Sequence, residues 1–330
     1  MTEKSFEPER MLRDLKRIER LRSIKMLMIP LAALFVLILA IAYFQPKVIS
    51  MRAFSSFATD AAPLLTLAMG ASLVILIGGI DLSIANMASF AAVTFVLMAP
   101  ALEDYAFIAV LLLAAFIGGC QGLVHSWAQI PSFVVSFGTL GILYGTTHYI
   151  SNATAAPLTA PSAVIAFLGA RTGVFPNGIF VVAIVAAVLI LAMRYTRLGR
   201  DIYAVGSAER AAYLSGVRTT RVRVIVFAIS GVCAALAGLL LLSQTSYSSP
   251  AMANNYLLPA IVGVVVGGVS ISGGVGGIGS ALIGGMIAVG VRLGTVIIGL
   301  NPAYQNIVFG IVILVAVALT IDREKIGIIK

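Results

Sequence analysis

Charged residues are scarce in this sequence. Asp, Glu, Lys and Arg make up 11% of its 330 residues, whereas soluble domains contain about 25%. Hydrophobic residues reach 60%, more than a soluble chain of this length could bury. Runs such as 31–42 and 181–192 are apolar on every face, which excludes the alternating strands of a membrane β-barrel. The sequence therefore predicts a helical membrane protein, because in lipid only helices and closed barrels satisfy the backbone.

Cysteine and histidine are rare as well. Cys120 and Cys233 both lie in apolar runs, and we expect two small buried thiols with neither a disulfide nor a metal. His125 and His148 lack any ligand spacing and are expected at the membrane interface or in packing. The apolar runs contain no cluster of His, Cys, Asp or Glu, so the sequence predicts no metal site, no catalytic residue and no membrane-embedded enzyme.

The apolar runs set the predicted architecture, since one membrane crossing needs roughly 20 residues. We expect spans near 26–44, 62–78, 82–99, 106–126, 131–150, 179–195, 223–242, 258–270, 277–299 and 305–321. The fold class is an all-α polytopic membrane protein of about ten transmembrane helices with a short cytoplasmic coupling helix. The transmembrane domain covers 26–321, between a cytosolic N-terminal tail at 1–25 and a cytosolic C-terminal tail at 322–330. The Gly-rich span 258–270 is expected to be broken or tilted.

Basic residues gather between the apolar runs. The first 25 positions, the region 194–223 and the C-terminus hold 18 of the 22 Lys and Arg residues. An even number of spans places all three regions on one side, and the positive-inside rule makes that side cytoplasmic. The net charge of +9 is therefore attributed to membrane topology and not to nucleic-acid binding. The segment 151–177 lies outside, and its prolines favour an ordered cap over a flexible linker.

The charged segment at 197–217 has the pattern of a short exposed helix. Ser207 can cap its N-terminus, Glu209 complements the helix dipole in the first turn, and Gly216 can end the helix. Ala208, Ala211 and Ala212 would give a small-residue face that another protein could approach. The alternative is an ordinary cytosolic loop.

Residues 196–206, Thr-Arg-Leu-Gly-Arg-Asp-Ile-Tyr-Ala-Val-Gly, followed by 211–217, resemble the coupling segment of ribose-type permeases of bacterial binding-protein-dependent ABC importers. Segments 74–83, 130–140 and 260–274 are similar to the same family in the same order, so the resemblance covers roughly 60–321. It places eight residues against an ATPase: Ala204, Gly206, Ser207, Glu209, Ala211, Ala212, Leu214 and Gly216.

The resemblance also implies partners and a location. The chain would be a multi-pass protein of the bacterial inner membrane, surrounded by lipid. It would pair with a second permease copy or a homologous permease, with ABC ATPase subunits, and with a periplasmic or lipoprotein solute-binding protein. No Walker loop is present, so ATP and Mg are expected to be used by the ATPase, and no cofactor is expected on this chain.

Polar residues within the apolar regions are the candidates for a solute path. In residues 78–83, Gly-Gly-Ile-Asp-Leu-Ser, Asp81 can cap the next helix by accepting from the Ser83 or Ile84 N–H. The functional alternative places Asp81, Ser83 and Asn86 on the path, because polar groups at membrane depth usually face a cavity. Residues 267–272 echo this segment, which suggests either an internal repeat or chance similarity.

A second group lies at 130–140. Ser132, Ser136 and Thr139 share one helix face, where hydroxyls could line a sugar path or serve interhelical packing. Phe133 is included as a path candidate, although packing explains it better than stacking on sugar. A small-residue stripe at Gly276, Ser280, Gly284 and Ala288 predicts close helix packing.

Arg292 is the charged residue inside a predicted span. It lies in the outer third of its helix, so it either snorkels outward or lines the path and favours an anionic solute such as a sugar acid. The sequence thus predicts an ABC importer permease for a sugar or sugar-like solute that acts by alternating access. The alternatives are a sister permease for nucleosides, branched-chain amino acids or another small polar solute, and a stand-alone carrier or channel.

Overall fold

The computed structural model of the chain describes residues 28–46, 50–297, 299, 301 and 303–320, so the predicted tails at 1–25 and 322–330 lie outside it. Its helices are Met28–Phe44, α2 (Met51–Leu76), α3 (Ile84–Leu102), α4 (Tyr105–Trp127), α5 (Ser132–Ile150), α6 (Ala163–Gly169), α7 (Asn177–Tyr195), α8 (Arg197–Leu214), α9 (Thr219–Thr245), α10 (Leu257–Val266), α11 (Ile278–Ile297) and α12 (Ala303–Thr320). The shorter elements are β1 (Ala156–Pro157), β2 (Arg171–Thr172), β3 (Phe175–Pro176), β4 (Tyr247–Ser248) and the 3-10 helix η2 (Asn254–Tyr256).

Each predicted span overlaps a helix of the structure. In the described part of the chain, six helices are long and apolar enough to cross a membrane, namely α2, α3, α4, α7, α9 and α11. Met28–Phe44, Asn254–Val266 and Tyr304–Leu314 are shorter apolar helices. The predicted short span 258–270 is in fact a helix of 10 residues that ends at Val266. The chain is therefore an all-α membrane protein.

The start of α2 differs most from the prediction. The helix begins at Met51 and not near 62, since its first turns carry polar residues that a search for apolar runs passes over. Ser50 caps these turns by accepting a hydrogen bond from the Ala53 N–H at 3.2 Å. Thr59 Oγ1 donates to the Ser55 carbonyl one turn back, at 2.9 Å. The side chains of Ser50 and Thr59 thus bond to nearby backbone and do not interrupt the helix.

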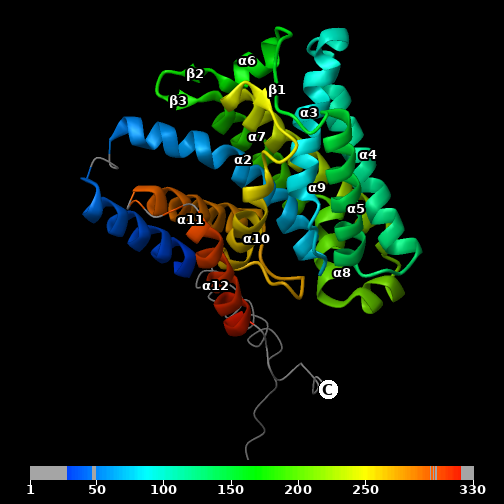
Figure 1. Ribbon diagram of the computed structural model, residues 1–330. Coiled ribbons are helices and arrows are strands. Elements are labelled where there is room, and N and C mark those ends of the chain that lie inside the picture. Colours follow the sequence, from blue (N-terminus) through cyan, green and yellow to red (C-terminus); the bar gives the residue numbers. More distant parts are fainter. Residues whose placement is uncertain (1–27, 47–49, 298, 300, 302, 321–330) are drawn as a thin grey trace, which may run out of the picture.

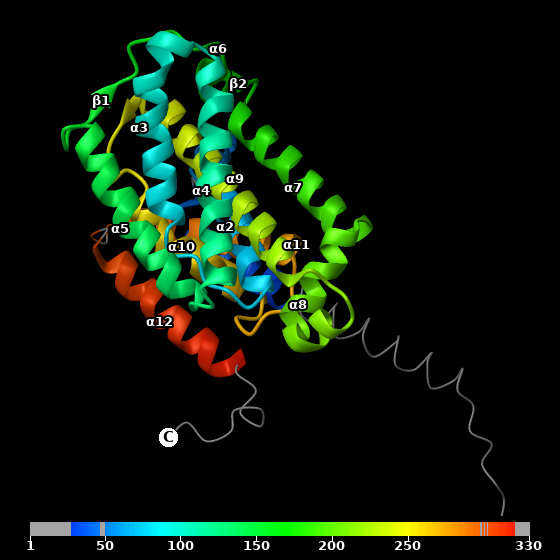
Figure 2. The ribbon, with the colours of Figure 1, turned by 90° about the vertical axis from the view of Figure 1, so that its right-hand side faces the viewer.

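The centre of the bundle is formed by α2 and α9, whose apolar stretches are 89% and 72% buried. Helix α9 packs against α2, α3 and α4, and the two views of the ribbon show α9 running between these helices (Figures 1 and 2). A Cβ at Gly118 of α4 would overlap the Phe227 carbonyl, and one at Gly231 would overlap the Ala114 carbonyl. Reciprocal glycines therefore bring α4 and α9 into backbone contact, as small residues do in membrane helix pairs.

The two ends of the bundle differ in structure. Helix α8 lies at one end, whereas α6 and the short strands lie at the other (Figure 1). At that second end β1 pairs antiparallel with β4, and β2 pairs antiparallel with β3. The prediction that 151–177 forms an ordered cap is confirmed, because this segment contains α6 and three of the strands.

The two cysteines differ in burial, and the predicted small-residue stripe lies only partly within a helix. Cys233 is buried as predicted, but Cys120 is exposed on α4, so the prediction of two buried thiols is wrong for Cys120. The reason is that α4 packs on α9 along one stripe and leaves its other faces to the surroundings. In the predicted stripe, Gly284 lies against the Gly263 carbonyl of α10, whereas Gly276 precedes α11 and is not helical.

Candidate functional site

Asp81 is the centre of a buried hydrogen-bond network. Its side chain is 6% exposed, and its Oδ1 accepts from the Ser83 N–H at 2.9 Å and from Ser83 Oγ at 2.6 Å. Gln121 Nε2 of α4 donates to the same oxygen at 3.1 Å, and Ser230 Oγ of α9 donates to Oδ2 at 3.2 Å. The Ser83 N–H bond is one of the two predicted for Asp81, but the N-cap residue of α3 is Ser83, and no side chain caps this helix.

This network joins three parts of the bundle. Asp81 lies in the connection from α2 to α3, Gln121 in the last turns of α4, and Ser230 in the middle of α9. Several neutral donors can stabilise a buried carboxylate, since hydrogen bonds to an ionised acceptor are stronger than neutral ones. Gln121 and Ser230 were missed in the sequence, although each is a polar residue within a long apolar run.

The hydroxyls of α5 hold the same connection from its other side. Ser132 Oγ accepts from the Ile80 N–H at 3.0 Å, and Ser136 Oγ lies 3.2 Å from the Ile80 carbonyl, to which it can donate. Ser132 and Ser136 thus bind both backbone groups of one residue. The two hydroxyls lie on one face of α5, as predicted, and both contact backbone atoms of the protein.

The remaining path candidates are placed differently. Asn86 is 7% exposed and its Nδ2 donates to the Leu140 carbonyl of α5 at 3.1 Å. Thr139 Oγ1 bonds within its own helix, to the Val135 carbonyl at 3.0 Å. Phe133 is 51% exposed on α5. A direct role of these side chains in solute passage stays a prediction.

Helix α8 consists of two helical parts. Ala208, with φ −161° and ψ 89°, breaks the helix immediately after Ser207, where the sequence predicted an N-terminus. In the second part, Glu209 forms a salt bridge with Arg223 of α9. The second part ends as predicted, because Gly216 has a φ of 86°.

The second part of α8 presents a different surface from the predicted alanine face. Tyr213 and Leu214 are 67% and 77% exposed, and Ala211 is exposed beside them. Ala212 is 5% exposed and points into the bundle. The exposed surface is therefore mixed and includes Tyr213, which sequence reasoning missed. Of the other coupling candidates, Ala204 is half-buried and Ser207 is exposed.

The first part of α8 is fixed to the ends of two membrane helices. A Cβ at Gly206 would overlap the Leu76 carbonyl at the end of α2, so the two backbones touch. The same carbonyl accepts from the Gly274 N–H at 2.9 Å, and Tyr203 Oη donates to the Gly276 carbonyl at 2.8 Å. Helix α8 therefore contacts both α2 and the connection between α10 and α11.

The two similar segments noted in the sequence form the same turn. After α2, Gly78 N–H donates to the Ile75 carbonyl and Gly79 N–H to the Val74 carbonyl. After α10, the N–H groups of residues 268 and 269 make the equivalent bonds to the carbonyls of residues 265 and 264. Gly78 and Gly268 have φ values of 76° and 96°. The structure thus equates residue 78 with residue 268, one position later than the sequence comparison suggested.

Arg292 lies on α11 with its guanidinium carbon 4.1 Å from the centre of the Tyr256 ring. This distance is within the range of a cation–π interaction. The Arg292 carbonyl accepts from Thr295 Oγ1 and from Gln305 Nε2, but the guanidinium takes part in neither bond.

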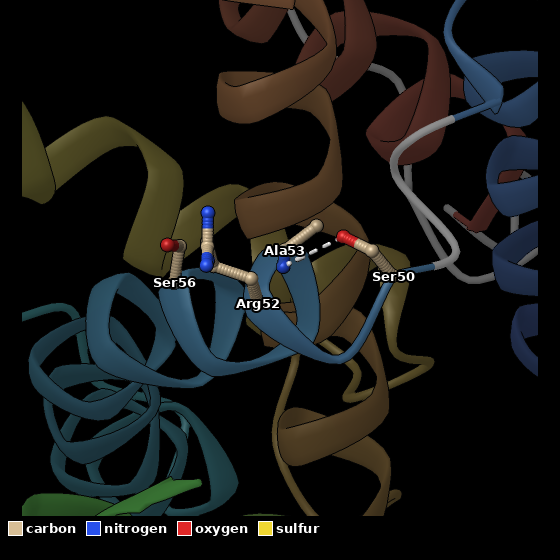
Figure 3. A pocket seen from close by; sticks show the side chains of 4 residues that line it. All are labelled: Ser50, Arg52, Ala53 and Ser56. Carbon is tan, nitrogen blue, oxygen red and sulfur yellow. Dashed lines mark hydrogen bonds between the residues drawn. The ribbon is translucent and has the colours of Figure 1, made fainter.

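An open depression lies at the first turn of α2 (Figure 3). It is lined by Ser50, Arg52, Ala53 and Ser56, and the dashed line in the figure marks the capping bond from the Ala53 N–H to Ser50 Oγ. None of the predicted path or coupling residues lines it. A smaller polar pocket lies between α2, α6, α7 and α9 and includes Arg171 and Gln244.

The described residues contain no group of three or more His, Cys, Asp or Glu that could hold a metal.

The apolar helices and the kinked helix α8 define a class: an all-α integral membrane protein with a partly exposed helix that contacts the end of α2 and the connection between α10 and α11. The chain belongs to the family described as "Branched-chain amino acid transport system / permease component", whose family model matches residues 53–317.

Characterised members of this family are similar over most of their length. The chain is 33% identical to the ribose import permease protein RbsC of Haemophilus influenzae, covering 86% of this chain and 90% of that protein. It is 31% identical to RbsC of Escherichia coli K12, with 89% and 93% covered. It is 34% identical to the D-allose transport system permease protein AlsC of the same strain, with 76% and 78% covered. No solved structure is significantly similar.

Proposed function

We propose that this chain is the membrane-spanning permease subunit of an ATP-driven ABC importer that moves a sugar or sugar-like solute across the bacterial inner membrane. The main support is its similarity, over 86% of the chain, to a permease named for ribose import. Similarity to a D-allose permease supports the same solute class. These relatives do not favour nucleosides or a stand-alone carrier.

The geometry of α8 supports a mechanism for coupling. Its second part, residues 209–214, is exposed except for the buried Ala212, and we propose that it contacts an ATPase subunit. Its first part touches the end of α2 through Gly206 and the connection before α11 through Tyr203. When ATP-driven closure moves α8, the inner ends of α2 and α11 move with it. The path between two permease subunits then opens to alternate sides, and the solute is bound only weakly.

The same proposal sets the topology. We assign ten spans, with both termini and α8 in the cytoplasm and the β1–β4 and β2–β3 pairs outside. The placement of α8 and α6 at opposite ends of the bundle supports this assignment (Figure 2). The partners are ABC ATPase subunits that use ATP and Mg, a periplasmic or lipoprotein solute-binding protein, and a second permease copy or a homologous permease. No cofactor and no nucleic acid is assigned to this chain.

The proposal is tested by gentle purification of the tagged chain from its native membranes, followed by mass spectrometry of the proteins that accompany it. We expect an ABC ATPase, and we expect Ala211→Asp with Leu214→Asp to release it while the permease remains in the membrane. Ala155→Asp is the matched control, because Ala155 is exposed at the opposite end of the molecule. Purification without any ATPase, even after mild crosslinking, would favour the stand-alone carrier.

A further inference from the structure

A polar cavity lies between α2, α6, α7 and α9, at the end of the bundle opposite α8 (Figure 1). Its volume is about 150 Å³. One water molecule needs roughly 15 Å³ of such space, and sites for drug-sized ligands begin at roughly 300 Å³. The cavity therefore has room for a ligand of about the size of one sugar ring.

Close contacts between helices fix the walls of this cavity. A Cβ at Gly169 of α6 would lie 2.6 Å from the Ser243 carbonyl oxygen of α9. A Cβ at Gly178 of α7 would lie 2.9 Å from Leu240 Cδ2, and all four of these residues belong to the lining. The close approach of α6 and α7 to α9 thus depends on glycine at both positions.

The short strands supply the rim of the cavity. Arg171 of β2 and Pro176 of β3 line it. Asn177, which is 5% exposed, fixes these strands to α6, because its N–H donates to the Ala170 carbonyl at 2.9 Å and its Nδ2 donates to the Phe167 carbonyl at 3.0 Å. The rim is therefore held in place without a ligand, which reduces the entropy lost when a ligand binds.

Four polar residues of the lining retain hydrogen-bonding capacity. Thr59 Oγ1 and Ser243 Oγ each donate to a backbone carbonyl of their own helix, at 2.9 and 2.8 Å, so both hydroxyls keep lone pairs that can accept. Gln244 Nε2 donates to the Thr59 carbonyl at 2.8 Å, which leaves its second hydrogen for another acceptor. Arg171 is exposed and forms no ion pair within the described part of the chain.

This set of groups matches a neutral sugar. The Thr59 and Ser243 hydroxyls accept from sugar hydroxyls, whereas the Gln244 amide and the Arg171 guanidinium donate to sugar oxygens. No described residue of the lining carries a carboxylate, which a cationic ligand would require. The single charge of the lining, on Arg171, is exposed to solvent, so salt and water weaken its attraction for an anion.

We infer that this cavity is a weak binding site for a neutral monosaccharide at the outer end of the permease. The inference rests on the proposed importer function and adds a binding site to it. In the proposed topology the cavity lies on the side from which solute arrives. None of its lining residues is among the path residues predicted from the sequence.

The test measures sugar binding directly and without the binding protein. The full chain, with its ATPase, is placed in lipid nanodiscs, and saturation-transfer NMR is recorded with neutral aldopentoses and aldohexoses and, separately, with uronic acids. We expect transfer to a neutral sugar. Ser243→Ala should raise its dissociation constant roughly three- to tenfold, because one neutral hydrogen bond is lost. Gly178→Ala should raise it roughly tenfold, because the added methyl group displaces Leu240 in the wall.

Two control variants match these changes. Gly145→Ala adds the same methyl group on α5, where nothing lies within 4 Å of a Cβ. Ser56→Ala removes an exposed hydroxyl of α2 that lines the separate depression (Figure 3). Both should change the dissociation constant less than about twofold. If Gly178→Ala does not reach the membrane, Ser243→Ala and its control suffice, since this change removes one hydroxyl and adds no volume.

The outcomes separate this inference from the proposed function. If no neutral sugar binds, or if it binds wild type, Ser243→Ala and Gly178→Ala equally, the inference is wrong, while sugar uptake by the complete importer in proteoliposomes would leave the proposed function intact. Binding of uronic acids alone would also overturn the inference, because the charge of Arg171 would then select the ligand. An importer that moves no neutral sugar would overturn the proposed function and the inference with it.

Discussion

Gly206 of α8 lies directly against the carbonyl of Leu76, the last residue of α2, and no side chain fits between them. That carbonyl also accepts a hydrogen bond from the Gly274 N–H, at 2.9 Å. Three segments far apart in the sequence therefore meet at one peptide group. Because α8 carries the surface proposed for the ATPase, this contact connects the helix that bears that surface directly to α2.

The first prediction concerns this contact. Gly206→Ala should lower solute uptake roughly tenfold and should weaken stability by about 1–3 kcal/mol, because the added methyl group overlaps backbone that cannot move away. Uptake in proteoliposomes and thermal unfolding in detergent measure the two effects. Gly279→Ala is the matched control, since nothing lies within 4 Å of a Cβ at Gly279. Equal behaviour of the two variants would contradict a role for the contact.

The second prediction concerns the buried carboxylate. Asp81→Ala removes the acceptor used by the Ser83 N–H, Gln121 Nε2 and Ser230 Oγ, whereas Ser83 Oγ still has Gln121 Oε1 as an acceptor at 3.1 Å. We expect a loss of about 3 kcal/mol or more. Asp81→Asn keeps one acceptor oxygen and should cost less. Thermal unfolding in detergent measures both, with Glu103→Gln as an exposed acidic control.

Much of the fold follows from the sequence because lipid restricts the choices. Each long apolar run had to be a helix, and the structure contains a helix in each. The hydrogen bond from the Ser83 N–H to Asp81 and the end of α8 at Gly216 followed from local chemistry alone. The early turns of α2 were not predicted, since hydropathy cannot show that Ser50 and Thr59 bond within the helix.

The polar contacts between helices were only partly predictable. The common face of Ser132 and Ser136 follows from helical spacing, but their partner Ile80 is more than 50 residues away in the sequence. Periodicity shows which side chains share a face and not which backbone lies opposite.

The third prediction concerns the salt bridge between Glu209 and Arg223. It lies just after the break at Ala208 and joins the second part of α8 to α9. Glu209→Arg and Arg223→Glu should each reduce ATPase copurification and uptake, because the exposed part of α8 loses its fixed orientation. The effect on stability should stay near 1 kcal/mol or less, since one partner is substantially exposed. Uptake by the double variant, with the charges exchanged, should recover; failure to recover would indicate separate roles for the two residues.

The fourth prediction concerns the effect of acid on the cap formed by α6 and the short strands. Asp104, in the turn between α3 and α4, accepts from Ser162 Oγ at 2.6 Å and from the Val164 N–H at 3.2 Å. These bonds, that from Ser162 first, lower the pKa of Asp104 below its ordinary 3.8. A lowered pKa means that the folded cap favours the carboxylate, so its contribution is complete above pH 3.8 and is lost as the pH falls through the lowered pKa. Backbone hydrogen exchange in α6 should therefore be slow at neutral pH and accelerate in strong acid. Asp104→Asn should show the faster exchange already at neutral pH and little further acceleration, whereas unchanged exchange in this variant would mean that the carboxylate does not hold α6.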